Sequence, residues 1–236
     1  MTVIEPPSRV PIMVVAAHPD DMESWCAGTL VRAIDSGATV RLLLVTSGEH
    51  GTSAGSDVPE LVATRREAEA QAAAQRLGLA EVAFLHYPDG DVEATRSLRG
   101  DLVMWIRRWQ PHALFTHDPE HPWPPYLSHR DHRSVGRATL DAIYPLARDP
   151  LAFPEHGSAG LEPHAVREVW LFASEAANFY VDITHGLERK IAARLAHVSQ
   201  TSEPAALPES WRARASVIGA PAGLACAEAF TIVAID

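Results

Sequence analysis

Short apolar runs alternate with segments of helical periodicity along the first 150 residues of the chain. The apolar runs lack strict apolar–polar alternation, which is typical of strands that are covered on both faces. These runs are residues 10–17, 39–46, 81–87 and 112–117. Between them, apolar residues at helical spacing predict helices from Asp21 to a cap at Gly37, at about 59–77, at 98–109 and at 129–146. The alternation predicts an α/β fold: a doubly wound, mostly parallel (Rossmann-like) sheet with helices on both faces.

The alternation of apolar runs and helical segments is less regular after about residue 150. Residues 168–173 and 179–183 are predicted as two further strands, and residues 187–197 as a helix. The segment 208–236 fits a helix or a strand equally well. The chain has no internal repeat, no low-complexity tract and no convincing linker. We therefore expect a single domain over 1–236, with a core at about 10–150 and a C-terminal extension of the same domain at about 151–236.

Composition and charge exclude several classes of protein. The 236 residues are 47% hydrophobic and 21% charged, which is ordinary globular usage. The formal charge of −10 argues against a nucleic-acid partner or an anionic membrane surface. The apolar runs are too short to span a membrane, and the first residues do not resemble a signal peptide, so a cytoplasmic location is expected. Two cysteines 200 positions apart, Cys26 and Cys226, exclude a disulfide scaffold and a cysteine zinc site.

The chain contains 12 histidines, and one of them begins the first candidate cluster, His18-Pro19-Asp20-Asp21. This cluster directly follows the strand predicted at 10–17. Ligands of open α/β sheets bind beyond the carboxyl ends of the strands, which is where these side chains stand. Two adjacent carboxylates repel each other unless a cation lies between them. The alternative is that Asp20 or Asp21 only caps the following helix.

The second cluster, Ser128-His129-Arg130-Asp131-His132, follows the strand predicted at 112–117. His129 and His132 are three positions apart and share one face of a helical turn. Ser128 and Asp131 also fit a capping box, which would explain Asp131 without catalysis. In the common strand order 3-2-1-4-5, the first and fourth strands are neighbours. The two clusters would then meet at one edge of the sheet.

Together the clusters contain the ligands of a catalytic metal site. Two imidazoles and one carboxylate, with one position left to water, are a catalytic zinc set, and His18, Asp21 and His132 supply it. Asp20 and His129 are then free as acid–base groups. Magnesium would need more carboxylates and fewer histidines, so one Zn²⁺ per chain, or another divalent transition metal, is expected.

The AHPDD segment (17–21) and the HRDH segment (129–132) resemble the two signatures of the PIG-L/LmbE-like N-acetylglucosamine deacetylases. Weaker matches are spread over most of the chain. They are the TSGEHG loop (46–51), Arg66-x-x-Glu69, the YPDG turn (87–90) and AEAF (227–230).

The resemblance implies that zinc-bound water, with Asp20 as general base, removes the acetyl group from an N-acetylglucosamine-containing small molecule. His18, Asp21 and His132 would bind the zinc. His129 would support the oxyanion and protonate the leaving amine, and Asp131 would tune His129. The sequence does not decide whether the chain forms a homo-oligomer. We also expect three residues to contact the substrate. The expected contacts are Arg66, Glu49 and His121.

Two other functions remain open from the residues. The first is a metal hydrolase of another amide or ester linkage, such as a phosphoester. Two-metal phosphoesterases need additional carboxylates, and we find none at a suitable spacing. The second is a non-catalytic sugar-binding module, which would have no need of both Asp20 and His129.

Overall fold

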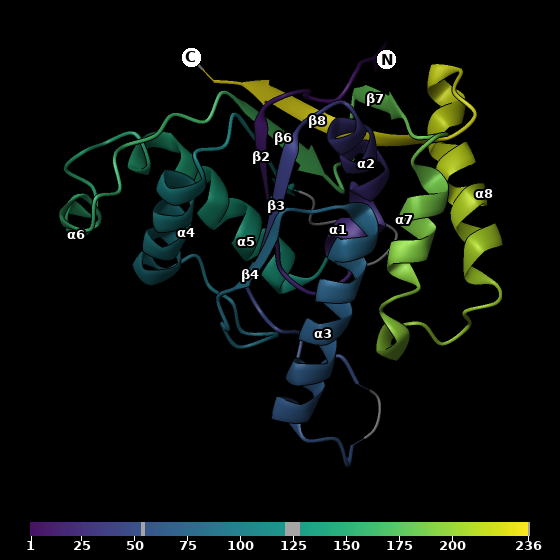
Figure 1. Ribbon diagram of the computed structural model, residues 1–236, viewed down its shortest axis with the longest axis horizontal. Coiled ribbons are helices and arrows are strands. Elements are labelled where there is room, and N and C mark those ends of the chain that lie inside the picture. The colour runs from purple at the N-terminus through teal and green to yellow at the C-terminus, as the bar shows by residue number, and fades with distance from the viewer. Residues whose placement is uncertain (53–54, 121–127, 236) are drawn as a thin grey trace.

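The strands of the computed structural model, which describes residues 1–52, 55–120 and 128–235, form one open sheet (Figure 1). The order is β1-β7-β8-β6-β5-β2-β3-β4. Neighbouring strands are parallel except that β8 is antiparallel to both β6 and β7. The strands are β1 (Thr2–Val3), β2 (Pro11–Ala16), β3 (Thr39–Leu44), β4 (Glu81–Phe84), β5 (Ala113–His117), β6 (Glu168–Phe172), β7 (Phe179–Asp182) and β8 (Ala227–Ala234).

The predicted fold class is confirmed. The five strands β4, β3, β2, β5 and β6 are spatial neighbours in this order, which corresponds to the expected strand order 3-2-1-4-5. β2 lies between β3 and β5, with Val14 paired to Leu42 on one side and to Phe115 on the other. The carboxyl ends of β2 and β5 are therefore adjacent, and the segments that follow them meet at one edge of the sheet.

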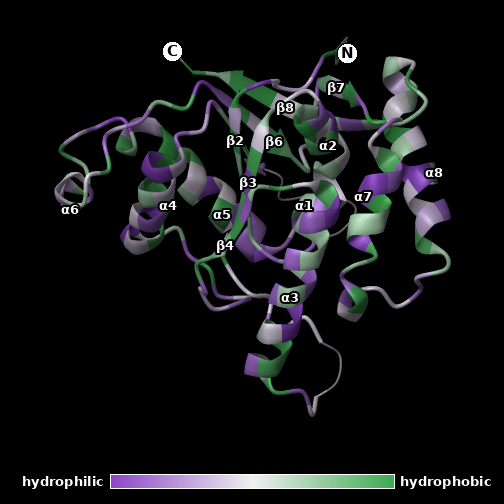
Figure 2. Cartoon of the chain, viewed as in Figure 1, coloured by the Kyte–Doolittle hydropathy of each residue, from purple (hydrophilic) through white to green (hydrophobic). Residues whose placement is uncertain are grey.

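Helices cover both faces of the sheet because successive side chains of a strand point in opposite directions. Ile12 and Val14 pack with α1, α2, α3, α7 and α8, whereas Met13 and Val15 pack with α4 and α5. Hydropathy colouring shows the apolar strands between these helices (Figure 2). The helices are α1 (Asp21–Trp25), α2 (Ala27–Asp35), α3 (Pro59–Leu77), α4 (Arg96–Trp109), α5 (Arg130–Asp141), α6 (Pro154–Ser158), α7 (Leu187–Arg194) and α8 (Leu207–Gly219). None of the described helices is long and apolar enough to cross a membrane.

Several helix boundaries differ from the sequence-based expectations. α4 begins at Arg96 rather than 98, and α7 ends at Arg194 rather than 197. The helix expected from Asp21 to Gly37 is two helices, because the backbone leaves helical geometry at Cys26. The helix expected to end at about residue 146 is kinked after α5, with extended backbone at Tyr144 just before Pro145. The segment 208–236 contains both candidates, the helix α8 and the strand β8. The short elements β1 and α6 were not predicted.

Candidate active site

The turn after β2 fixes the first cluster in an unusual backbone conformation. Asp20 has a φ of 97°, in the left-handed region that residues other than glycine rarely adopt. It occupies the N-cap position of α1, but its side chain makes no capping hydrogen bond. The carboxylate of Asp21 turns back and accepts a hydrogen bond of 2.8 Å from the backbone N–H of His18. Neither aspartate therefore shows the helix-capping contact that was the alternative to a functional role.

The second cluster begins α5, and the capping box that was the alternative to a functional role for Asp131 is not formed. The N-cap residue is His129, whose Nδ1 accepts a hydrogen bond of 3.2 Å from the backbone N–H of Asp131. The Asp131 carboxylate is fully buried and accepts hydrogen bonds from the backbone N–H groups of Gly90 and Val92. The Asp131 side chain is thus hydrogen-bonded to the backbone at residues 90 and 92 rather than to the N-terminus of its own helix.

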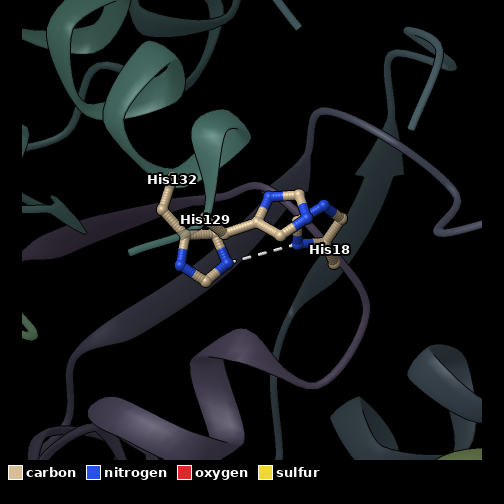
Figure 3. A group of neighbouring side chains, drawn as sticks. All are labelled: His18, His129 and His132. Carbon is tan, nitrogen blue, oxygen red and sulfur yellow. Dashed lines mark hydrogen bonds between the residues drawn. The ribbon is translucent and has the colours of Figure 1, made fainter. Parts of the chain in front are cut away.

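The structure brings His18, Asp21 and His132 together. His18 Nδ1 lies 3.3 Å from His132 Nε2 and 3.4 Å from the Asp21 carboxylate, whose other oxygen lies 3.1 Å from His132 Nε2. Figure 3 shows His18 facing His132, with the dashed line between their rings, and His129 beside them. The His129 ring centroid is 4.7 Å from that of His18. Three donor groups from two segments far apart in the sequence thus lie within 3.4 Å of one another.

Two carboxylates approach the opposite side of the His18 ring. His18 Nε2 lies 3.0 Å from Asp89 Oδ1 and 3.2 Å from Asp131 Oδ2. The expectation that the site has no additional carboxylates at a suitable spacing is therefore wrong. Asp89 was overlooked because the YPDG turn lies far from both clusters in sequence, and only the sheet brings them together.

The neighbouring side chains of the site have pKa values that are shifted in different directions. Burial would lower the pKa of His18, but hydrogen bonds that its ring donates to Asp131, Asp21 and Asp89 outweigh burial and hold the pKa well above its usual value. Burial would raise the pKa of Asp21, but the facing rings of His132 and His117 hold it well below its usual range. Burial, followed by the neighbouring His18 and His132, lowers the pKa of His129. Asp21 is accordingly an anion and His129 a neutral imidazole.

His117, the last residue of β5, was not selected as a site residue. It is buried, its Nε2 lies 3.4 Å from Asp21, and its ring stacks on that of His132 at 4.1 Å between centroids. Burial, more than any other cause, lowers its pKa to about 4, so the ring is neutral. His117 belongs to the donor group that also contains Asp21 and His132. Its position at the carboxyl end of a central strand was the available signal.

Asp20 lies between two arginines. Its carboxylate oxygens are 3.5 Å from Arg66 and 3.4 Å from Arg194. Burial, with the nearby Asp21 charge, raises the pKa of Asp20, and the two arginines partly oppose this rise. Arg194 belongs to α7 and was not predicted. A carboxyl group with this environment is a stronger proton acceptor than an exposed aspartate.

The three expected substrate contacts have different surroundings. Arg66 is 4% exposed and donates hydrogen bonds to the carbonyls of Gly48 and Pro19. The guanidinium fills the space beside Gly48, where a Cβ would lie 2.1 Å from its Nη1. Glu49 accepts a hydrogen bond of 2.9 Å from the backbone N–H of Asp89. His121 lies outside the described residues. Substrate contact by all three stays a prediction.

The His and Asp groups at the carboxyl ends of β2 and β5 form a possible metal centre in an α/β enzyme fold. The chain matches the family model described as "PIG-L: GlcNAc-PI de-N-acetylase" over residues 13–143. It is 33% identical over 192 residues to diacetylchitobiose deacetylase of Thermococcus kodakarensis, covering 81% of this chain and 70% of that protein. These matches show that the chain belongs to the PIG-L family, as its signatures predicted.

Two further similarities agree with this assignment. The chain is 31% identical over 228 residues to the 1D-myo-inositol 2-acetamido-2-deoxy-alpha-D-glucopyranoside deacetylase of Rhodococcus erythropolis, covering 85% of this chain and 67% of that protein. The structure of N,N'-diacetylchitobiose deacetylase from Pyrococcus horikoshii superposes with a TM-score of 0.87 at 29% identity, covering 95% of this chain and 84% of that one. All three named relatives are deacetylases.

Proposed function

We propose that this protein is a zinc-dependent hydrolase that removes the acetyl group from an N-acetylglucosamine-containing small molecule and leaves a primary amine and acetate. The mutual proximity of the His18, Asp21 and His132 side chains carries the proposal, and the deacetylase activity of the named relatives supports it. The aglycone attached to the amino sugar is left open.

The spacing of the two imidazole nitrogens fits a tetrahedral ion. Two ligand atoms that each lie 2.0–2.1 Å from a tetrahedral zinc are about 3.3–3.4 Å apart. His18 Nδ1 and His132 Nε2 are 3.3 Å apart, and a different oxygen of Asp21 lies near each of them, at 3.4 and 3.1 Å. Two imidazoles and one carboxylate also leave a fourth position open, as catalytic zinc sites do. Zinc bound there would polarise the amide carbonyl and lower the pKa of a water molecule.

Asp20 serves as the general base in this proposal. Its half-buried carboxylate has a raised pKa and lies beside the proposed ligand Asp21 without sharing its contacts. It accepts the proton that the attacking water loses. Arg66 and Arg194 fix the direction of the carboxylate, because each arginine approaches a different oxygen.

His129 serves in this proposal as the hydrogen-bond donor to the substrate, in contrast to the proton acceptor Asp20. Its Nδ1 accepts the hydrogen bond of the Asp131 N–H, so the neutral ring carries its proton on Nε2. A neutral Nε2–H can stabilise negative charge on the carbonyl oxygen and afterwards supply a proton to the departing amine. The lowered pKa of His129 favours this neutral form.

The reaction products test this function against its main alternative. The purified protein is incubated with N-acetylglucosamine, N,N'-diacetylchitobiose and p-nitrophenyl phosphate, and acetate, primary amine and phosphate are measured. We expect acetate and amine in equal amounts, loss of both after zinc is removed with a chelator, and recovery when zinc is restored. Release of phosphate without amine would instead establish the phosphoesterase alternative.

A further inference from the structure

His18 is held at both nitrogens of its ring. Nδ1 faces His132 and Asp21 at 3.3 and 3.4 Å, whereas Nε2 faces Asp89 and Asp131 at 3.0 and 3.2 Å. The His18 side chain is 10% exposed, and those of Asp89 and Asp131 are 7% and 0% exposed. The ring is therefore enclosed between two different groups of partners.

The two carboxylates that face Nε2 are themselves fixed by backbone hydrogen bonds. Asp131 accepts from Gly90 N–H at 2.7 Å and from Val92 N–H at 3.1 Å. Asp89 accepts from His50 N–H at 3.0 Å through the oxygen that does not face His18. These bonds leave little freedom for either carboxylate to turn away from the ring.

The chemistry of these partners decides which nitrogen of His18 carries the proton. An ionised carboxylate only accepts hydrogen bonds, so a nitrogen placed between two carboxylates is an N–H. Metal binding requires the neutral ring, in which the other nitrogen presents its lone pair. Metal-binding histidines generally donate their second N–H to a carboxylate or a carbonyl, which fixes the ring and strengthens the metal bond.

We propose that Asp89 and Asp131 are positioning residues that keep the proton of His18 on Nε2 and present Nδ1 to the metal. The inference rests on the proposed metal site, and it assigns a role to Asp89 in the YPDG turn. It also changes the role of Asp131. The family resemblance linked this carboxylate to His129, but its side-chain contact in the site is with His18, and His129 meets only its backbone N–H.

Metal affinity of the purified full-length protein tests the proposal without substrate. Zn²⁺ is titrated against a chromophoric chelator for wild type, Asp89→Asn and Asp91→Asn. The asparagine at 89 has one acceptor oxygen for two donors, His50 N–H and His18 Nε2–H. We expect zinc affinity to fall by about 10–100-fold in Asp89→Asn, the usual effect of losing such a partner.

Asp91→Asn is the matched control. Asp91 lies two positions further along, its side chain is 74% exposed, and it pairs with Arg130 at the surface. It should bind zinc as the wild type does. If Asp89→Asn lowers only the melting temperature of the metal-free protein and binds zinc normally, the role is structural and the proposal is wrong.

The protonation of His18 provides a second, direct measurement. ¹⁵N NMR of the zinc-loaded wild type should show His18 with a proton on Nε2 and zinc on Nδ1. Zinc on Nε2, or a second equivalent of zinc that disappears in Asp89→Asn, would overturn the proposal. Wild type that binds one zinc with these signals but releases no acetate would refute only the deacetylase function, and wild type that binds no zinc would refute both.

Discussion

Two adjacent aspartates, Asp20 and Asp21, have nearly opposite surroundings. The left-handed conformation of Asp20 turns its carboxylate toward Arg66 and Arg194, while Asp21 turns toward His18, His117 and His132. Burial raises the pKa of Asp20, whereas the facing imidazoles outweigh burial and lower that of Asp21. The left-handed φ of Asp20 thus accompanies the separation of the proposed proton acceptor from the proposed metal ligand.

Asparagine substitutions at these two positions should therefore have different effects. Asp21→Asn replaces an anionic donor with a neutral one and should lose zinc and activity together. Asp20→Asn should keep zinc near wild-type occupancy, with a turnover that is lower by about 10²–10⁴-fold, the usual contribution of a positioned base. Zinc content, melting temperature and turnover are compared side by side. Zinc loss in Asp20→Asn and retention in Asp21→Asn would reverse the two roles.

Residue type and spacing were sufficient to select His18, Asp21, His129 and His132, because each stands at a strand end or a helix start. His117 also stands at a strand end and was passed over, but Asp89 and Arg194 could not be selected in the same way. Their relevance comes from contacts across the sheet, such as that of Arg194 in α7 with Asp20 in the first turn. One sequence does not reveal such contacts, because a lone aspartate in a turn or an arginine on a helix is usually exposed to solvent.

At the scale of elements, the distance between α5 and β5 sets the position of the second cluster. Gly136 of α5 faces the carbonyl oxygen of His117 so closely that a Cβ there would lie 2.4 Å from it. His132 stands one turn earlier on the same helix. The helix therefore approaches the strand at a glycine, and this approach places His132 against His117 and Asp21.

Gly136→Ala should move α5 away from β5. Because the atom in contact is a backbone oxygen, the helix rather than a side chain must shift. We expect a lower melting temperature, by several degrees for a destabilisation of about 1–3 kcal/mol, together with weaker zinc binding. Gly157→Ala is the control, since a Cβ there meets nothing within 4 Å. Unchanged zinc affinity in Gly136→Ala would show that this contact does not position His132.

The elements themselves were predicted unevenly. The strands and the helix α3 were predicted from apolar runs bounded by glycine or proline. The Gly78 cap of α3 has the expected positive φ of 85°. The break at Cys26 and the kink after α5 did not follow. The kink falls at Tyr144 and Pro145, and the helix predicted at about 129–146 passed over this proline.

At the scale of the whole molecule, residues after 150 complete the sheet that carries the site. β6 pairs with β5 over its full length, and Trp170 and Phe230 pack against Phe115 of β5. Glu228 of β8 accepts hydrogen bonds from the N–H groups of Gly28 and Thr29 at the start of α2. The family model matches residues 13–143, but the contacts of that region extend beyond it.

A fragment of residues 1–150 should therefore not fold by itself. It would expose the edge of β5 and leave Phe115 without its aromatic partners. We expect poor NMR dispersion and no cooperative thermal transition, whereas the full chain measured under the same conditions should have both. A fragment that unfolds cooperatively would divide the proposed single domain in two.

β8 also determines the order in which the protein can be completed during translation. It is synthesised after every other described strand, yet it lies between β6 and β7, and it joins β7 and β1 to the rest of the sheet. Until it leaves the ribosome, the edge of β6 remains unpaired, and an open edge can recruit strands from other chains. The nascent chain therefore stays vulnerable to aggregation at the edge of β6 until β8 has been inserted.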